Sequence, residues 1–194
     1  MKSPALYVKS RKTHSVCIVT MDFKCSLEAM NFSIIPVDNT NISILSTYTI
    51  NILKQIGYEA KLENIRITNT MRTSYDQARI MYENIVREGI ISQYKLYGWN
   101  GDQVIKVYET NKNKEKSEVI KLMENKINEL GPSRVSKHCV SDFSALNVLD
   151  IGLKYMTDTH LKNCSQVIAK YVKEGRLRFI DESDQNCFHL EIYQ

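Results

Sequence analysis

The chain has no long hydrophobic run and no regular spacing of cysteines. Its apolar stretches all fall short of the roughly 18 residues that a membrane-spanning helix needs, so no membrane span is expected. The five cysteines are an odd number, are widely scattered and form no Cys-x-x-Cys pair. This pattern argues against a disulfide framework and against a cysteine-rich zinc knuckle. Cys139 and Cys187 stand near histidines of interest, and reduced structural cysteines are the favoured interpretation of both.

Signals for export and for nucleic-acid binding are also missing. Residues 1–12 carry charge at both ends and no apolar segment, so no secretory signal peptide is predicted and synthesis in the cytoplasm is expected. The net charge of +4 suits an anionic partner without naming one. Lys and Glu are mixed over 111–129, which is typical of a solvated helix face. We therefore expect no nucleic-acid partner, and a monomer.

Length and periodicity predict one α+β domain over residues 1–194, with N-terminal strands and a helix over 1–60. The composition, 43% hydrophobic and 25% charged, is that of a soluble globular protein. The predicted elements are strands at 15–23 and 32–37, a helix at 42–56 capped within 39–41 and stopped by Gly57, an extended segment at 58–69, helices at 74–88, 115–130 and 158–174, and a strand pair at 176–180 and 187–193. The aromatic residues of 92–108 are interpreted as a loop packed on the core, with a groove wall for a ligand as the alternative.

Three residues are candidate metal ligands. His138 follows a serine by two positions, Asp150 lies in the apolar run Asn147–Ile151, and His189 lies in Cys-Phe-His-Leu-Glu-Ile near the C-terminus. Three protein ligands and a water are the usual make-up of a catalytic zinc site. Taken singly, histidines in apolar segments are more often core residues with satisfied hydrogen bonds, and the residues alone leave that alternative open.

The junction before the helix predicted at 74–88 holds a further candidate. Ser74 and Gln77 have the spacing of a capping box, which gives Gln77 a structural explanation. The capping box does not explain Arg72. The forked donors of an arginine at this junction can hold a carboxylate over the end of the sheet. A solvated arginine is the alternative.

Taken together, these residues resemble the zinc D-Ala-D-Ala carboxypeptidase and L-alanyl-D-glutamate peptidase family, which shares a hedgehog-like fold. That family has three blocks in order: Tyr-Arg-Ser/Thr followed by Gln, Ser-x-His followed by an Ala/Leu-Val-Asp strand, and a late aromatic-His strand. The corresponding blocks here are Met71–Thr73 with Gln77, Ser136–His138 with Val148–Asp150, and Phe188–Glu191. The resemblance covers about 65–192. It implies a small antiparallel sheet with flanking helices and one zinc ion (Zn2+) on His138, Asp150 and His189.

The chain departs from the family pattern in two places. His138 and Asp150 are 12 residues apart, which is longer than usual and suggests a looped insertion at 139–146. Asn186 stands where the family often has Glu, three residues before the last histidine, as general base. The acidic turn offers Glu182, the favoured replacement, and Asp184. Glu191 shares the face of His189 and is expected to support that ligand, with a role as base the alternative.

The resemblance also implies a function. Arg72 would hold the carbonyl oxygen or a carboxylate of the substrate, and Gln77 and Ser136 would help to bind the substrate. The expected activity is zinc-dependent hydrolysis of an amide bond in the stem peptides of peptidoglycan. Without a signal peptide, this suggests a phage or prophage lysis enzyme (an endolysin) or a virion component that acts on the cell wall after release. The alternatives are an inactive zinc-binding module on the same fold and a virion assembly protein whose histidines merely pack.

Overall fold

The computed structural model describes residues 32–38 and 40–194, so the strand predicted at 15–23 lies outside the described part. Five strands form one mixed sheet in the order β1-β2-β3-β5-β4. They are β1 (Ser33–Pro36), β2 (Asn64–Asn69), β3 (Leu146–Gly152), β4 (Arg178–Glu182) and β5 (Cys187–Tyr193). The prediction of an α+β fold is confirmed. The final strand pair also forms as predicted, joined by the 3₁₀ turn η3 (Ser183–Gln185).

One strand departs from the predicted antiparallel sheet. β1 runs parallel to β2, whereas all other neighbouring strands are antiparallel. The reason is helix α2 (Thr47–Glu59), which carries the chain from β1 to β2. A crossover of this kind returns the chain in the same direction, so the two strands lie parallel.

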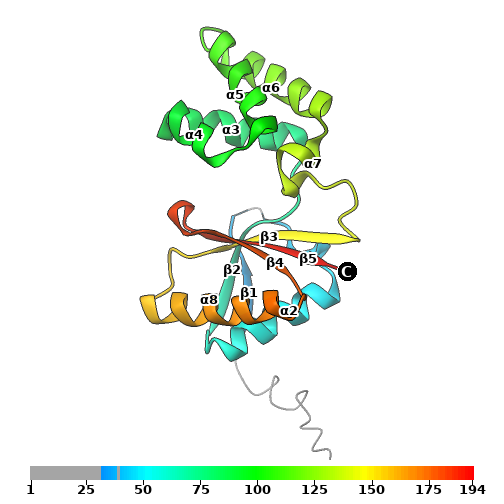
Figure 1. Ribbon diagram of the computed structural model, residues 1–194, viewed down its shortest axis with the longest axis vertical. Helices are drawn as coiled ribbons and strands as arrows, with labels where there is room; N and C mark the ends of the chain where they lie inside the picture. Colours follow the sequence, from blue (N-terminus) through cyan, green and yellow to red (C-terminus); the bar gives the residue numbers. More distant parts are fainter. Residues whose placement is uncertain (1–31, 39) are drawn as a thin grey trace, which may run out of the picture.

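Two helices cover one face of the sheet. Helix α2 and helix α8 (Asp158–Lys173) pack side by side beneath it (Figure 1). Leu149 and Ile151 of β3 point into this core and are fully buried. Because side chains alternate along a strand, Asp150 between them points to the opposite face.

The other helices form a separate group between β2 and β3 in the sequence, which we call the helical lobe. Its members are α3 (Ser74–Glu88), α4 (Ile90–Leu96), α5 (Trp99–Asn111), α6 (Lys116–Leu130) and α7 (Pro132–Val135). The lobe has its own apolar core, built around Met81, Ile105 and Met123. It lies across the sheet from α2 and α8 (Figure 1). At its base the backbone N–H of Arg72 donates to the carbonyl of His138 at 2.8 Å, so the lobe begins and ends at one point.

The first helix begins later than predicted. Asn41 caps only a 3₁₀ turn, Ile42–Ile44. Helix α2 starts after Ser46, whose hydroxyl accepts from the backbone N–H of Thr49. The sequence offers two capping residues in succession, and the chain uses the second for the long helix.

Tight packing explains two further differences from the predictions. Gly57 lies inside α2 and does not end it, and a side chain there would collide with the ring of Phe32. Residues 92–108 are mostly helical, within α4 and α5, and not a loop. At Gly101 a Cβ would come within 2.5 Å of the Tyr97 side chain, so a glycine permits the two helices to meet closely.

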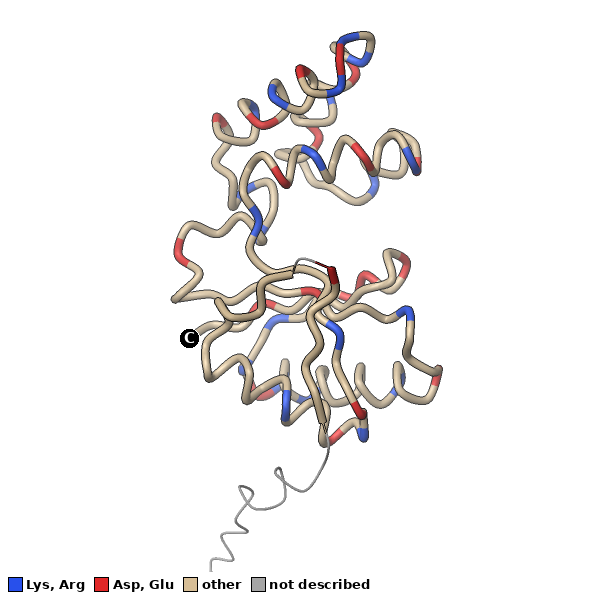
Figure 2. The backbone as a smooth tube through the Cα atoms, turned by 180° about the vertical axis from the view of Figure 1, so that it is seen from behind, with Lys and Arg blue, Asp and Glu red and all other residues tan. Residues whose placement is uncertain are grey.

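Basic and acidic residues are interspersed along the chain (Figure 2). On and near α6 they pair along the helix surface, as predicted for a solvated face, in the pairs Lys114–Glu118, Lys121–Glu124 and Lys126–Glu129. Exposed pairs of this kind contribute little to stability, about 0.2–1 kcal/mol each. Among the described residues, none of the helices has the length and apolar character needed to span a membrane.

Candidate metal centre

The three predicted ligands converge on the face of the sheet that is turned towards the helical lobe. Asp150 on β3 and His189 on β5 are direct partners in the strand register. His138 reaches them from the 3₁₀ turn η2 (Lys137–Cys139), and not from a strand as predicted. Its Nε2 lies 3.1 Å from Asp150 Oδ1, and Nδ1 of His189 lies 3.0 Å from the same oxygen. All three residues are buried.

The spacing of these atoms fits a metal ion. One ligand atom from each residue lies within 4.8 Å of the others. In a tetrahedral zinc site with bonds of about 2.0–2.2 Å, neighbouring ligand atoms stand roughly 3.3–3.6 Å apart. The two contacts to Asp150 need to lengthen by only about 0.3 Å to reach the lower end of that range. Two imidazoles and one carboxylate are also a donor set that zinc accepts.

Outer contacts orient both imidazole rings. The carbonyl oxygen of Thr70 lies 2.6 Å from Nδ1 of His138, and a carbonyl can only accept. The proton of a neutral His138 ring therefore sits on Nδ1, which leaves the lone pair of Nε2 directed at the centre. On His189, Nε2 lies 3.6 Å from Oε1 of Glu191, which leaves Nδ1 for the centre. This placement agrees with the supporting role predicted for Glu191.

The electrostatics of the centre favour a cation between the ligands. Burial alone would raise the pKa of Asp150, but His138, His189 and Arg72 together hold that pKa well below its usual value. Burial would likewise lower the pKa of His189, but the hydrogen bond and charge of Asp150 outweigh this and raise it. The carboxylate of Asp150 thus favours the protonated ring of His189 when no metal is bound, and a proton on Nδ1 competes with a metal ion for the same lone pair.

Arg72 stands at the edge of the centre, where β2 passes into the helical lobe. Its Nη2 lies 3.5 Å from Asp150 Oδ2, and its Nε donates to Asn69 Oδ1 at 3.2 Å. Its Nη1 donates to Gln77 Oε1 at 3.1 Å, and the amide of Gln77 donates to the hydroxyl of Tyr97 at 2.9 Å. With only 14% of its side chain exposed, Arg72 is not a solvated surface residue.

Gln77 lies behind Arg72 and has no contact with solvent. It is free to hold Arg72 because the N-cap of α3 is Thr73, whose hydroxyl accepts from the N–H of Asp76, and not Ser74 as predicted. The geometry gives Gln77 a positioning role for the guanidinium, whereas direct substrate binding was expected. Ser136 lines the cleft described below, although it is the residue after α7 and lies on no strand.

The two acidic candidates for the base occupy different surroundings. Glu182 ends β4 and lines the cleft, and its carboxylate lies within 4.8 Å of ligand atoms of Asp150 and Cys187. Asp184 sits in the turn η3 and is exposed, away from the centre. Asn186 ends that turn with φ +58, a conformation that Asn tolerates better than Glu does. Asn at this position therefore has a conformational explanation.

The third carboxylate, Glu191, is committed to other contacts. It is 1% exposed, and Oε1 accepts from Nη1 of Arg178 at 2.8 Å. A carboxylate buried and paired in this way is poorly placed to take a proton from an attacking water.

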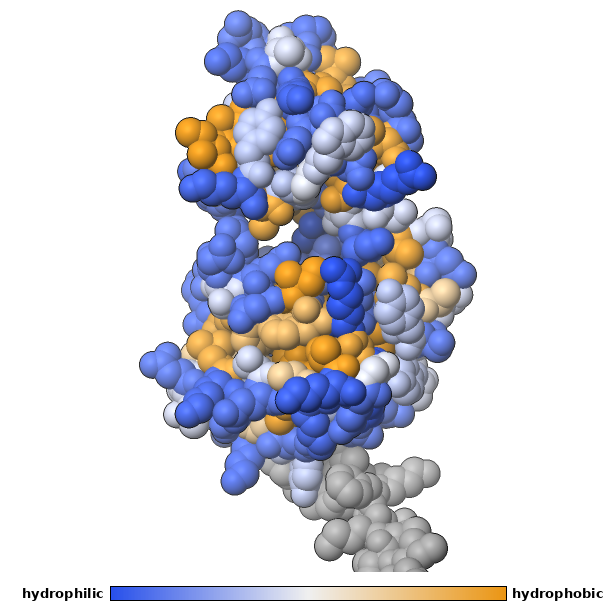
Figure 3. Space-filling view, viewed as in Figure 1, coloured by the Kyte–Doolittle hydropathy of each residue, from blue (hydrophilic) through white to orange (hydrophobic). Residues whose placement is uncertain are grey.

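A cleft of about 500 Å³ opens above the centre, between the helical lobe and the sheet. The space-filling view shows the molecule hollowed between these two parts (Figure 3). The lobe contributes residues of α3 and the α4–α5 turn, among them Asn84 and Tyr97, and the sheet contributes Ile180, Glu182 and His189. The centre is therefore buried on its ligand side and reachable from the cleft.

Sequence reasoning missed the residues that complete this arrangement. Asn69 donates to Asp150 Oδ2 at 3.1 Å, and nothing in the sequence singled it out. The Thr70 carbonyl is a backbone group, which sequence patterns do not reveal. Tyr97 was noted as one of several aromatic residues, and its place on the cleft wall agrees with the alternative given for 92–108. Burial raises the pKa of Tyr97 to about 12, so its hydroxyl stays protonated.

The chain matches no protein-family model, no curated protein and no solved structure in the comparisons made. The case for a function therefore depends on the geometry of the centre and on the sequence blocks.

Proposed function

We propose that the protein is a zinc-dependent peptidase that hydrolyses an amide bond in the stem peptides of peptidoglycan. The observation that carries the proposal is the convergence of His138, Asp150 and His189 beneath a cleft whose walls include Arg72 and Glu182. Support also comes from the three sequence blocks, whose order and elements resemble those of the D-Ala-D-Ala carboxypeptidase family. We further propose that the fold is the hedgehog-like one of that family.

Each residue has a defined task in this proposal. A bound zinc ion would lower the pKa of a bound water towards about 7 and polarise the amide carbonyl. Glu182 takes the proton of the attacking water and later gives it to the leaving amine. Arg72, held by Asn69 and Gln77, donates to the carbonyl oxygen as negative charge develops there, or holds a substrate carboxylate. Ser136 orients a group of the substrate on the cleft wall.

Two measurements test the proposal. The first is the zinc content of the purified protein, expected to be one ion per chain, and its loss in a His189→Ala variant. His160→Ala is the matched control, because this histidine lies on α8, outside the centre, and its loss should leave the zinc in place. The second is digestion of purified peptidoglycan, followed by the release of new amino groups. An intact protein without zinc, or a His189→Ala protein that retains it, would refute the proposal.

A second candidate function rests on Cys187. Its sulfur lies within 4.8 Å of a carboxylate oxygen of Asp150, and it lines the same cleft. If the thiolate became a fourth ligand, the metal would have no open position, as in structural zinc sites. The protein would then be a zinc-stabilised module that binds the cell wall or a virion without cleaving. Thiolate-to-metal charge-transfer absorption in the cobalt-substituted protein, lost in Cys187→Ser, would favour this candidate. Its absence together with turnover favours the peptidase.

The site of action is also part of the proposal. We infer that the protein acts on the cell wall after release from the cell in which it is made, or as a component of a virion. Detection of the protein in purified virions, or in the medium only after lysis, separates these two routes.

A further inference from the structure

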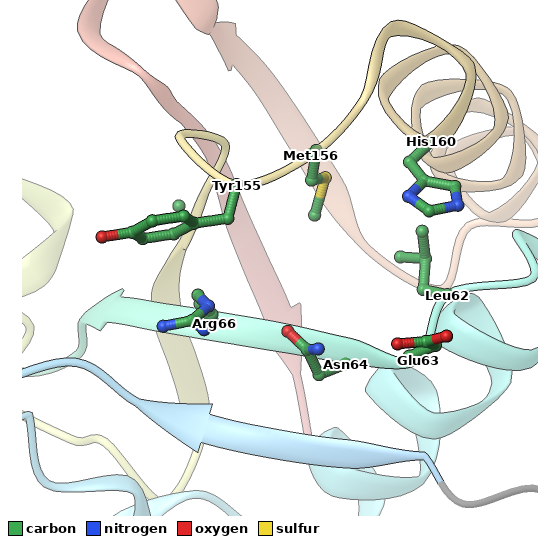
Figure 4. A pocket seen from close by; sticks show the side chains of 8 residues that line it. Leu62, Glu63, Asn64, Arg66, Tyr155, Met156 and His160 are labelled. Atoms are coloured by element: carbon green, nitrogen blue, oxygen red, sulfur yellow. The ribbon is translucent and has the colours of Figure 1, made fainter.

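A second and smaller pocket opens on the same sheet, at the end of β2 that points away from the helical lobe. It has a volume of about 110 Å³, which is room for several water molecules and hence for a small polar group. Arg66 and Asn64 line it from β2, Tyr155 and Met156 line it from the segment before α8, and His160 lines it from the first turn of α8 (Figure 4). None of these residues takes part in the metal centre.

Arg66 has unused donors in this pocket. Among the described residues, its guanidinium has no carboxylate within ion-pair distance, and its Nε is shielded from solvent without an acceptor. The ring of Tyr155 covers the guanidinium, with 4.4 Å from Cζ to the ring centroid. A cation that has lost part of its water and has no anionic partner attracts an anion more strongly than a fully hydrated one does.

The stacking also fixes which atoms of Arg66 meet a ligand. Figure 4 shows the guanidinium beneath the Tyr155 ring, with the Asn64 amide next to it along β2. The terminal nitrogens are the planar, forked donors that match the two oxygens of a carboxylate. Glu63, which also borders the pocket, lies at the far end beside His160 and forms no ion pair with Arg66. An anion therefore fits at the Arg66 end.

The pocket shares a sheet face with the metal centre. Ile67 pairs with Ile151 in the strand register, which puts Arg66 next to Gly152 on the neighbouring strand. Because Ile67 and Ile151 both point into the core beneath the sheet, the side chains of Arg66 and Asp150 leave the sheet on the opposite face. From strand spacings, the Cα atoms of Arg66 and Asp150 lie about 8 Å apart along the sheet. An extended peptide advances about 3.3–3.6 Å per residue, so a peptide with its reacting carbonyl at the centre reaches Arg66 about two residues away.

We propose that this pocket binds a carboxylate group of the substrate, held by the terminal nitrogens of Arg66 and the amide of Asn64. The inference rests on the proposed peptidase function, for which it names a substrate requirement: a free carboxylate about two residues from the bond that is cut. Tyr155 positions the guanidinium by stacking on it.

The test uses the protein freed of metal by a chelator, so that it does not depend on catalysis. The side-chain Nε–Hε signal of Arg66 is followed by NMR while N-acetyl-D-alanyl-D-alanyl-D-alanine, whose carboxylate lies two residues beyond its first peptide bond, or its C-terminal amide is added. Acetate and inorganic phosphate are titrated separately as simple anions. We expect a saturable shift with the acid and with acetate, and none with the amide. In Arg66→Gln, binding of the acid, followed through backbone amides of the pocket, should weaken about tenfold to a hundredfold.

Arg79→Gln is the matched control, because it removes the same charge from a half-buried arginine of α3 that pairs with Asp76 and Glu83. Its binding of the acid should equal that of the wild type. Equal binding of acid and amide, no saturable response of Arg66, or a response to phosphate alone would each overturn the inference. Those results leave the zinc content untouched, so failure of this pocket is distinguishable from failure of the metal centre.

Discussion

Replacing Asp150 with asparagine removes the one carboxylate on which the whole centre depends. Its Oδ1 lies 3.0 Å from Nδ1 of His189 and 3.1 Å from Nε2 of His138. Its Oδ2 accepts from the amide of Asn69 at 3.1 Å and lies 3.5 Å from Nη2 of Arg72. An asparagine presents one oxygen and one NH₂ group. If the NH₂ takes the place of Oδ2, it faces the donors of Asn69 and Arg72. If it takes the place of Oδ1, it faces Nδ1 of His189, whose proton the carboxylate had stabilised. In both orientations the buried charge of Arg72 loses its counter-ion.

The expected loss of stability is large. Removing one partner of a buried ion pair costs about 3–5 kcal/mol, against a total of about 5–15 kcal/mol for a typical domain. For a chain of this size, about 2–4 °C of melting temperature is lost per kcal/mol, which gives a fall of roughly 6–20 °C in chelator. Zinc at 1,000 times its dissociation constant adds about 4.1 kcal/mol to the wild type. The Asp150→Asn protein should gain almost none of this.

Calorimetry or urea unfolding, each with chelator and with excess zinc, measures both effects. Asp184→Asn is the matched control, since this exposed aspartate has no ion pair among the described residues and should unfold as the wild type does. If Asp150→Asn were as stable as Asp184→Asn in chelator, the ion-pair reasoning would fail. If zinc stabilised it as much as the wild type, the ligand assignment would fail.

Three further predictions concern the neighbouring residues. The pKa of His189 is raised in the folded protein. Its protonated ring therefore stabilises the metal-free fold fully below the unfolded value of about 6.5, and this stability is lost as the pH rises through the folded value. Urea unfolding in chelator at about pH 6 and about pH 9 should show the loss in the wild type and not in His189→Ala. Arg72→Lys should retain zinc and fold but lower the hydrolysis rate by about 10²–10³, and a fully active variant would contradict its role. Glu182→Gln should bind zinc and release no amino groups from peptidoglycan, and turnover at the wild-type rate would exclude it as the base.

The shared orientation of Asp150 and His189 could be predicted, because each is a polar residue within an apolar strand. Asp150 lies between Leu149 and Ile151, which are fully buried on the helix-covered face. Alternation then turns the carboxylate to the opposite face, where it needs a partner. The same alternation applies to His189. Periodicity places these side chains on one face, whereas the resemblance of the three sequence blocks to the zinc peptidase family singled them out, together with His138, as metal ligands.

The contacts around Arg72 could not be predicted, because they depend on how the helical lobe folds back. Gln77 meets Tyr97 across 20 residues of chain, and the sequence shows no pattern for such a pair. Between the two acidic candidates the sequence favoured Glu182 only by the length of its side chain. Their actual positions depend on a turn of three residues closed by Asn186 in a left-handed conformation.

The hydrogen bond between Arg72 N and His138 O joins the two ends of the helical lobe, so the lobe is an insertion that leaves the sheet and returns to it at the same place. The chain between these two residues can change in length at small entropic cost. Shortening a loop of roughly 66 residues to about 10 changes the free energy of loop closure by only about 1.7 kcal/mol. The residues at the junction stay in place, whereas the lobe supplies one wall of the cleft. Evolution can therefore exchange this wall while it keeps the junction. Under the proposed function, a chimaera with a foreign lobe grafted at the junction should bind zinc as the wild type does and change its preference among peptides.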